Sequence, residues 1–179
     1  MIPQKQILIT NHLLAKQVTL DDLQLIHELH LLPETDEYNT QGIPTNTDET
    51  KGIIDVWIAS TDHVYTLWLK ETNEFIGITG IKPGKEKYLN AEIWYKLHLN
   101  HWNKGYATEM VNELLRYGFE DLQLHRIEAG CATQNTASAR VMEKAGMKQE
   151  GTKRKILPIR GEWHDAHIYA ILEEDWIKK

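Results

Sequence analysis

The sequence is poor in cysteine and in long apolar runs, and each shortage excludes a class of protein. Its single cysteine, Cys131, excludes an internal disulfide framework and suits a reducing compartment, so we expect a cytoplasmic protein. The longest apolar runs are only a few residues long, which excludes a membrane-spanning helix. The start of the chain has no charged region followed by an apolar stretch, so we expect no secretory signal.

Positive charge is also scarce relative to negative charge. Lys and Arg number 20 against 26 Asp and Glu, which gives a net charge of -6. Because affinity for nucleic acid comes mainly from cationic side chains that neutralise phosphates, this balance argues against a nucleic-acid partner. It is compatible with a cationic ligand such as an amine. At 179 residues and 41% apolar content, the chain fits a single domain, 1–179, with a sizeable core.

The nine histidines do not suggest a metal site. The close pairs His98 with His101 and His164 with His167 lack the Cys or carboxylate spacing of known zinc motifs. Residues three apart on a strand also point to opposite faces, which counts against the second pair. Cys131 lies in an apolar strand and is expected to be an inert core residue. We therefore expect no metal.

Hydrophobic periodicity predicts a mixed α/β protein. Residues 33–46 are polar and rich in turn formers, so we expect a loop there. The predicted order, β-α-α-β-β-β-α-β-α-β-β, indicates a mixed sheet with hairpins and crossovers rather than a doubly wound parallel sheet. Strands are expected at 7–18, 64–69, 75–82, 91–97, 126–132, 147–157 and 163–172, and helices from Thr19, from Thr47, over 104–119 and over 135–145.

The most informative motif is the turn from Trp102 to Glu109, between a strand-like run and an amphipathic helix. A turn containing Gly at a helix start leaves backbone N–H groups unpaired, and the helix dipole adds partial positive charge there. Such a turn suits phosphate, above all pyrophosphate. The motif lacks the three glycines of the dinucleotide fingerprint and the Gly-Lys-Ser/Thr ending of the P-loop.

This element order, with a Gly-Tyr-Ala turn opening the central helix, resembles the GNAT acetyltransferases. The most similar subgroup is the RimJ/RimL type, some of which acetylate the N-termini of ribosomal proteins. The resemblance extends over nearly the whole chain and rests on six stretches: 91–95, 102–109, 124–129, 135–140, 143–147 and 161–165. It implies the GNAT acyl-CoA N-acyltransferase fold and direct transfer of an acetyl group from acetyl-CoA to an amine.

The resemblance also implies the groups that hold acetyl-CoA. The end of strand 91–97 pairs its backbone with the pantetheine arm, which docks as a pseudo-strand. Asn135 both caps its own helix and contacts the arm. The cofactor-binding residues implied are Leu97, His98, Leu99, Trp102, Asn103, Lys104, Gly105, Tyr106, Ala107, Thr108, Asn135 and Ser138.

Two residues are candidates for the chemistry. Ser138 is implied to stabilise or protonate the CoA thiolate, because Met142 stands where many GNAT enzymes place a tyrosine acid. The alternative for Ser138 is a helix residue that bonds only locally. Glu92 is the candidate general base, and its alternative is a strand carboxylate paired with a neighbour such as Arg126. Some RimL-like enzymes use a Glu before the last hairpin, where this chain has Leu157.

The acceptor side is less defined. Trp94 and Trp163, with Trp57, are expected to line the amine pocket, and the run 153–155 either meets the 3′-phosphate of CoA or is a solvated strand edge. The acceptor is a protein N-terminal α-amine or a small-molecule amine, and a homodimer is implied only by resemblance. The alternatives are a non-catalytic acyl-CoA-binding or sensing module, or an interaction protein that retains the fold.

Overall fold

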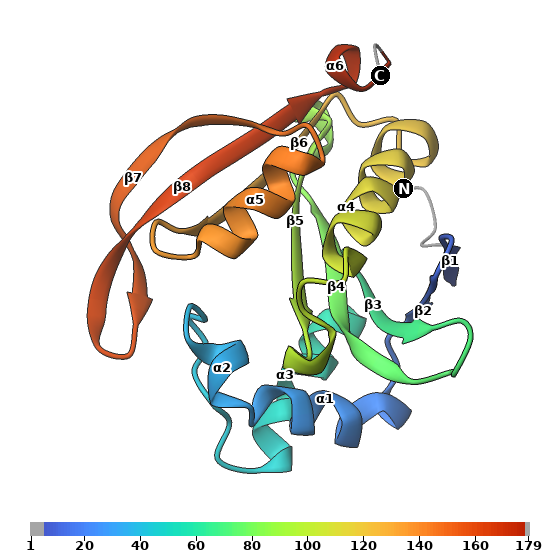
Figure 1. Cartoon of the computed structure of the whole chain (residues 1–179), viewed down its shortest axis with the longest axis vertical. Coiled ribbons are helices and arrows are strands. Elements are labelled where there is room, and N and C mark those ends of the chain that lie inside the picture. The colour runs from blue at the N-terminus through green and yellow to red at the C-terminus, as the bar shows by residue number, and fades with distance from the viewer. Residues whose placement is uncertain (1–5, 178–179) are drawn as a thin grey trace.

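The computed structural model describes residues 6–177, so the start of the chain, considered above for a secretory signal, lies largely outside the described residues. Figure 1 shows the strands as one curved sheet with helices on both faces. No helix in this part of the chain is long and apolar enough to cross a membrane. The strands are β1 (Ile7–Ile9), β2 (Leu13–Gln17), β3 (His63–Leu69), β4 (Phe75–Pro83), β5 (Asn90–Leu97), β6 (Arg126–Ala132), β7 (Lys148–Ile159) and β8 (Glu162–Leu172), and the helices are α1 (Leu23–His30), α2 (Pro33–Asp36), α3 (Thr47–Ala59), α4 (Tyr106–Arg116), α5 (Thr136–Lys144) and α6 (Glu173–Ile177).

The eight strands form a sheet in the order β1-β2-β3-β4-β5-β6-β8-β7. All neighbours are antiparallel except β5 and β6, which are parallel. This arrangement confirms the predicted mixed sheet. A parallel pair needs a crossover connection, and here α4 provides it.

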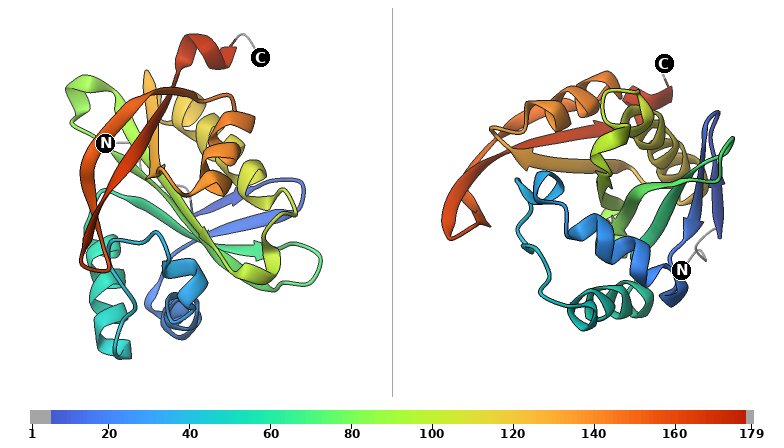
Figure 2. Two further views of the ribbon diagram at one scale, coloured as in Figure 1. Left: turned by 60° about the vertical axis from the view of Figure 1, so that its left-hand side comes forward. Right: turned by 60° about the horizontal axis from the view of Figure 1, so that its bottom comes forward.

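Two hydrophobic cores lie on opposite faces of the sheet. On one face, α4 and α5 cover a core whose helical part is Met110, Val111, Leu114, Leu115 and Met142. On the other, α1 and α3 contribute Ile26, Leu29 and Ile54 to a smaller core against β3 and β4. The right-hand view of Figure 2 shows these two groups of helices with the sheet between them.

Several predicted elements differ in detail. The run 7–18 is not one strand but the hairpin β1–β2, closed where Thr10 N–H donates to the Leu13 carbonyl. The predicted loop 33–46 contains the short helix α2, which begins at a proline, a residue suited to the first helical position. Leu20 and Ile58, whose helical spacing favours an inward position, are 43% and 51% exposed.

Candidate active site

Strands β5 and β6 pair over only three residues and then separate. The paired residues are Asn90 with Arg126, Ala91 with Ile127, and Glu92 with Glu128. Beyond them, β5 stays bonded to β4 and β6 to β8, so the pairing of the sheet is interrupted between 93–97 and 129–132, and this interruption is called the gap below (Figure 1). The two strands therefore splay apart beyond Glu92 and Glu128.

The free edge of β5 presents backbone polar groups to this gap. His98 N–H donates to the Ile76 carbonyl in β4. Because antiparallel pairing alternates along a strand, the N–H and C=O groups of Ile93, Tyr95 and Leu97 point away from β4, toward the gap. The Leu97 carbonyl accepts a hydrogen bond from Trp102 Nε1 at 2.8 Å, so Trp102 fixes the end of β5 to the turn before α4.

The turn before α4 has an open helix N-terminus. Asn103 and Gly105 adopt positive φ values of 58° and 85°, and Gly105 is the N-cap, with no side chain to satisfy the first N–H groups. A Cβ placed on Gly105 would meet no atom within 4 Å. The N–H groups of Tyr106, Ala107 and Thr108 precede the first helical bond, from Glu109 N–H to the Gly105 carbonyl. These three N–H groups have no partner within the helix, an arrangement that favours a negatively charged group at this end.

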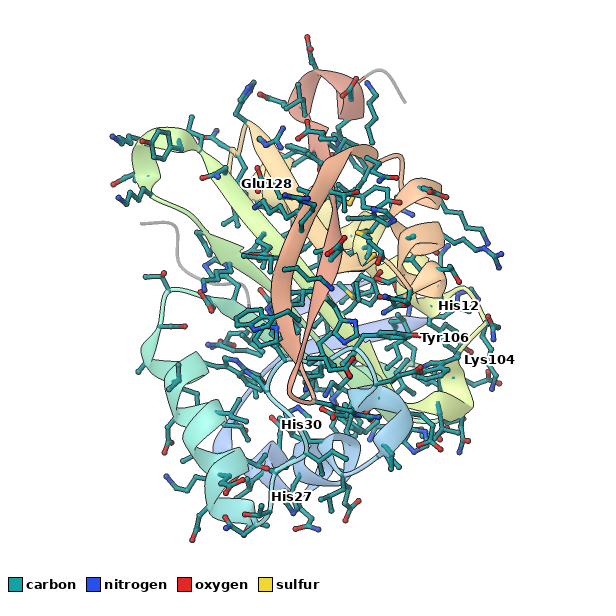
Figure 3. The ribbon with its side chains drawn as sticks, turned by 90° about the vertical axis from the view of Figure 1, so that its left-hand side faces the viewer. His12, His27, His30, Lys104, Tyr106 and Glu128 are labelled. Atoms are coloured by element: carbon teal, nitrogen blue, oxygen red, sulfur yellow. The ribbon has the colours of Figure 1, made fainter. Side chains whose placement is uncertain are left out.

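Glu109 anchors this helix start to the hairpin β1–β2. It accepts hydrogen bonds from the Thr10 hydroxyl and from the His12 N–H, the latter at 2.8 Å, and it pairs with His12 Nδ1 at 2.8 Å. Burial alone would raise the pKa of Glu109, but these hydrogen bonds outweigh it and hold the pKa below its usual range. Figure 3 shows His12 beside Tyr106 and Lys104, and the rings of His12 and Tyr106 lie 6.3 Å apart.

Ser138 lies at the start of α5, on the same face as α4. Its backbone N–H donates to Asn135 Oδ1 at 3.0 Å, which confirms Asn135 as the helix cap. Its hydroxyl lies 2.7 Å from the hydroxyl of Tyr95, a residue on the free part of β5. Burial raises the pKa of Tyr95 to about 12, although the Ser138 hydrogen bond lowers it, so the phenol remains protonated near neutral pH. This pair of hydroxyls joins β5 to α5.

Glu92 lies at the closed end of the gap, in the last pair that joins β5 to β6. Its side chain is exposed. It does not pair with Arg126, the partner suggested as its alternative. Arg126 instead bonds to Glu128 at 2.6 Å and to Glu150.

The opposite face of β5 carries an aromatic wall. Trp94 packs against Trp57 with ring centroids 5.5 Å apart, and Trp57 meets His30 edge-on at 6.3 Å. Gly80 in β4 permits this packing, because a Cβ there would come within 2.7 Å of the Trp94 ring. Trp94 and Trp57 thus lie together on this face of the sheet. Trp163 lies apart on β8, 59% exposed, where it lines a hollow of about 570 Å³ with Lys155 and Glu162.

Beside this wall lies a cluster of buried titratable groups. Lys96 Nζ and Asp36 Oδ1 are buried, and neither has a hydrogen-bond partner among the described residues. Burial lowers the pKa of Lys96 to about 8, against an opposing effect of the Asp36 carboxylate. Burial, aided by Lys96 and His27, lowers the pKa of His30 to about 4. Arg160, in the turn between β7 and β8, reaches within 3.9 Å of Asp36.

Sequence reasoning missed Tyr95, Lys96, His30 and Asp36 as site residues. Tyr95 shares a face of β5 with Ile93 and Leu97, which places it on the side of α5, but its partner Ser138 is 43 residues away. Lys96 interrupts the apolar run 93–97, which was the available signal. Asp36 fell within the predicted loop, so nothing indicated its burial.

The remaining predicted groups are found on the surface or in the core. Cys131 is buried, and burial raises its pKa to about 11, as expected for an inert thiol. In the run 153–155, Lys155 Nζ donates to the Trp163 carbonyl at 2.9 Å. Within residues 6–177, no group of three or more His, Cys, Asp or Glu is arranged to hold a metal ion.

Known proteins share this fold and sequence. A family model described as the acetyltransferase (GNAT) domain matches residues 12–148. The N-acetyltransferase YnaD of Bacillus subtilis is 35% identical over 93% of this chain and 97% of its own. A GNAT-family acetyltransferase from Bacillus anthracis, solved as a crystal structure, is 31% identical with a TM-score of 0.85, covering 94% of this chain and 99% of that one.

A more distant structure shares the fold. It is spermidine N-acetyltransferase from Vibrio cholerae in complex with CoA and spermine, 22% identical with a TM-score of 0.83, covering 93% of this chain and 98% of that one. The matched domain and the similarity to YnaD along almost the whole chain agree with the gap and the open turn. The chain belongs to the GNAT family and is an N-acetyltransferase that moves an acetyl group from acetyl-CoA to an amine.

Proposed function

We propose that acetyl-CoA binds on the α4–α5 face, with its thioester in the gap between β5 and β6, and that the acceptor amine arrives from the opposite face. The observation that carries this proposal is the end of β5–β6 pairing after Glu92 and Glu128. A gap through the sheet lets two reactants meet although a continuous sheet would separate them.

Each part of acetyl-CoA has a matching group. The pyrophosphate suits the N–H groups of the turn from Asn103 to Thr108, since Gly105 leaves the space above them open. The pantetheine arm contains amides and suits the free edge of β5 up to the Leu97 N–H; of the implied segment Leu97 to Leu99, the His98 N–H is already bonded to β4. The thioester carbonyl then lies near the β5 N–H groups, a contact that stabilises negative charge as the amine attacks.

The CoA thiolate leaves toward Ser138. We infer that the Ser138 hydroxyl stabilises or protonates the sulfur, with the protonated Tyr95 phenol as its hydrogen-bond partner at 2.7 Å. Met142, which stands where many GNAT enzymes place a tyrosine acid, is fully buried in the core and has no proton to give. Ser138 is therefore the group on α5 that we assign to the sulfur.

The acceptor that we propose is either the α-amine of a protein N-terminus, as in RimJ/RimL-like enzymes, or a small-molecule amine. The V. cholerae structure with spermine supports small amines as acceptors of this fold. The aromatic wall of Trp94 and Trp57 supports an acceptor with an apolar part next to its amine.

Calorimetric titration with acetyl-CoA, followed by thiol release with spermidine and with a short peptide that has a free N-terminus, tests this proposal. We expect binding, and release with one of the two acceptor classes. Binding without release by any amine would indicate an acyl-CoA sensor. Absence of acetyl-CoA binding would overturn the assignment of the gap and the turn.

A further inference from the structure

Lys96 lies on β5 next to the gap, on the face of the sheet that α1 and α3 cover. It lies on the free part of the strand, beyond the last pair with β6, and its register partner in β4 is Ile78. Ile78 belongs to the core beneath α1 and α3, so the Lys96 side chain lies on the acceptor face, while its neighbour Tyr95 faces α5. Lys96 is therefore at the edge of the gap, on the side from which we propose that the amine arrives.

The ε-amine of Lys96 is buried without a hydrogen-bond partner among the described residues. A buried polar group in this state costs free energy. Asp36 Oδ1 is also buried without a hydrogen bond, in a residue that is only 2% exposed. An incoming polar group can satisfy both, which points to a ligand rather than to a purely structural role.

The charged and titratable groups around Lys96 come from four elements. The helix α1 contributes His30 and His27, α2 contributes Asp36, and the turn between β7 and β8 contributes Arg160, which approaches Asp36. On β5 itself, Glu92 shares the face of Lys96 but lies at the closed end and is exposed. Burial thus disfavours the charged form of Lys96, and Asp36 partly restores it.

We propose that Lys96 is the general base of the acetyl transfer and that Asp36 positions and stabilises it. This proposal rests on the proposed function. The acceptor nitrogen attacks the thioester carbon and its proton passes to the neutral ε-amine of Lys96. The C–S bond then breaks, the CoA thiolate takes a proton from the Ser138 hydroxyl, which regains one from solvent, and Lys96 releases the proton of the amine to solvent. A lysine whose pKa is lowered to about 8 is suited to this role near neutral pH.

Three substitutions test the role through kinetics. We expect Lys96→Met to lower kcat by about 100-fold or more, with the KM for acetyl-CoA little changed. Lys96→Arg keeps a positive charge but cannot give up its proton, so it should be equally slow. Lys82→Met, the same change at the exposed closed end of the gap, should retain activity. A rise in acceptor KM alone, or rescue by Lys96→Arg, would show that Lys96 only binds the acceptor and would overturn the proposal.

The pH profile gives a second readout that a structural role would not move. Because Asp36 raises the pKa of Lys96, Asp36→Asn should shift the rising limb of kcat/KM to lower pH with the same acceptor. The titration of the acceptor is identical in both enzymes, so any shift belongs to the protein. An unmoved limb, or loss of the limb in Glu92→Gln, would assign the base elsewhere.

A measurement without an acceptor separates this proposal from the proposed function. In the complex with CoA, the ¹³Cε signal of Lys96, assigned by its absence from Lys96→Met, should titrate well below an ordinary lysine and lower still in Asp36→Asn. An ordinary lysine pKa would overturn the proposal even if acetyl transfer is observed. Failure of the wild type to bind CoA would instead contradict the proposed function.

Discussion

At the scale of the residue, the backbone and the hydroxyl of Ser138 have separate partners. The backbone N–H completes the Asn135 cap, and the hydroxyl meets Tyr95. Ser138→Ala therefore removes the hydroxyl and leaves the cap. We expect kcat to fall by about 100-fold, as for loss of a general acid, with little change in the free energy of unfolding.

Steady-state kinetics and urea unfolding of Ser138→Ala check this expectation. Asn135→Ala is the matched control, since it removes the cap and should cost about 1 kcal/mol of stability while it keeps the hydroxyl. Full kcat in Ser138→Ala would show that the CoA thiolate needs no help from this side chain.

Gly105 and Gly161 form a matched pair of glycines. Their φ values are 85° and 83°, and a Cβ on either would meet no atom within 4 Å. Alanine in the left-handed region costs about 1 kcal/mol in either turn. Calorimetry should show weaker acetyl-CoA binding for Gly105→Ala only, because Gly105 alone lies at the start of α4. Equal dissociation constants in the two variants would contradict the assignment of the turn.

At the scale of the element, the β7–β8 hairpin is linked to α2. Arg160, in the turn of the hairpin, donates to the Pro33 carbonyl at 3.3 Å and approaches Asp36. Arg160→Ala removes this link, so we expect faster amide exchange in α2 and a higher KM for the acceptor.

The KM for acetyl-CoA should stay the same in Arg160→Ala, because the cofactor turn lies on the other face of the sheet. Lys85→Ala, at an exposed lysine in the turn after β4, is the control and should change neither constant. A change confined to acetyl-CoA would mean that the hairpin serves the cofactor instead.

Local sequence signals predicted most of these elements. Strand 126–132 matches β6 residue for residue, and Asn135 marks the start of α5 as expected, while Gly146, with a φ of 85°, follows its end. The hairpin within 7–18 was missed because its turn, Thr10-Asn11-His12, contains neither Gly nor Pro. Helix α2 was missed because a single turn in a polar stretch has no apolar period to detect.

The site was predictable only where the motif is local. The turn at Gly105 could be recognised because its residues are contiguous. Lys96 and Asp36 are 60 positions apart in the sequence and influence one another only after α2 folds over β5. Burial, which decides the behaviour of Lys96, is a property of the packed molecule and has no signature in a strand of mixed residues.

At the scale of the whole molecule, the buried His30 makes stability depend on pH. Its pKa is about 4 in the folded protein and near 6.5 when unfolded, so the unfolded chain binds more protons between these values. The stability from the neutral ring is fully present above pH 6.5 and is lost as pH falls toward 4. Between pH 7 and 5 we expect a loss of about 2 kcal/mol.

Urea unfolding at pH 7 and pH 5 measures this loss. His30→Asn should remove most of it, because asparagine has no proton to bind, whereas a change at the exposed His125 should not. The range from pH 5 to pH 7 lies mostly above the pKa values of ordinary carboxyl groups, so those groups contribute little to the loss. An equal loss in wild type and His30→Asn would assign the dependence to other groups.

The gap between β5 and β6 also has a consequence for the order of events in catalysis. In the proposed arrangement the donor and the acceptor enter from opposite faces of the sheet, so neither obstructs the entrance of the other. Initial-rate plots should intersect, as for a ternary complex assembled in either order, and CoA should compete with acetyl-CoA but not with the amine. Such an enzyme can bind acetyl-CoA first and stay in that complex until an acceptor binds, even one as large as the terminus of another protein chain.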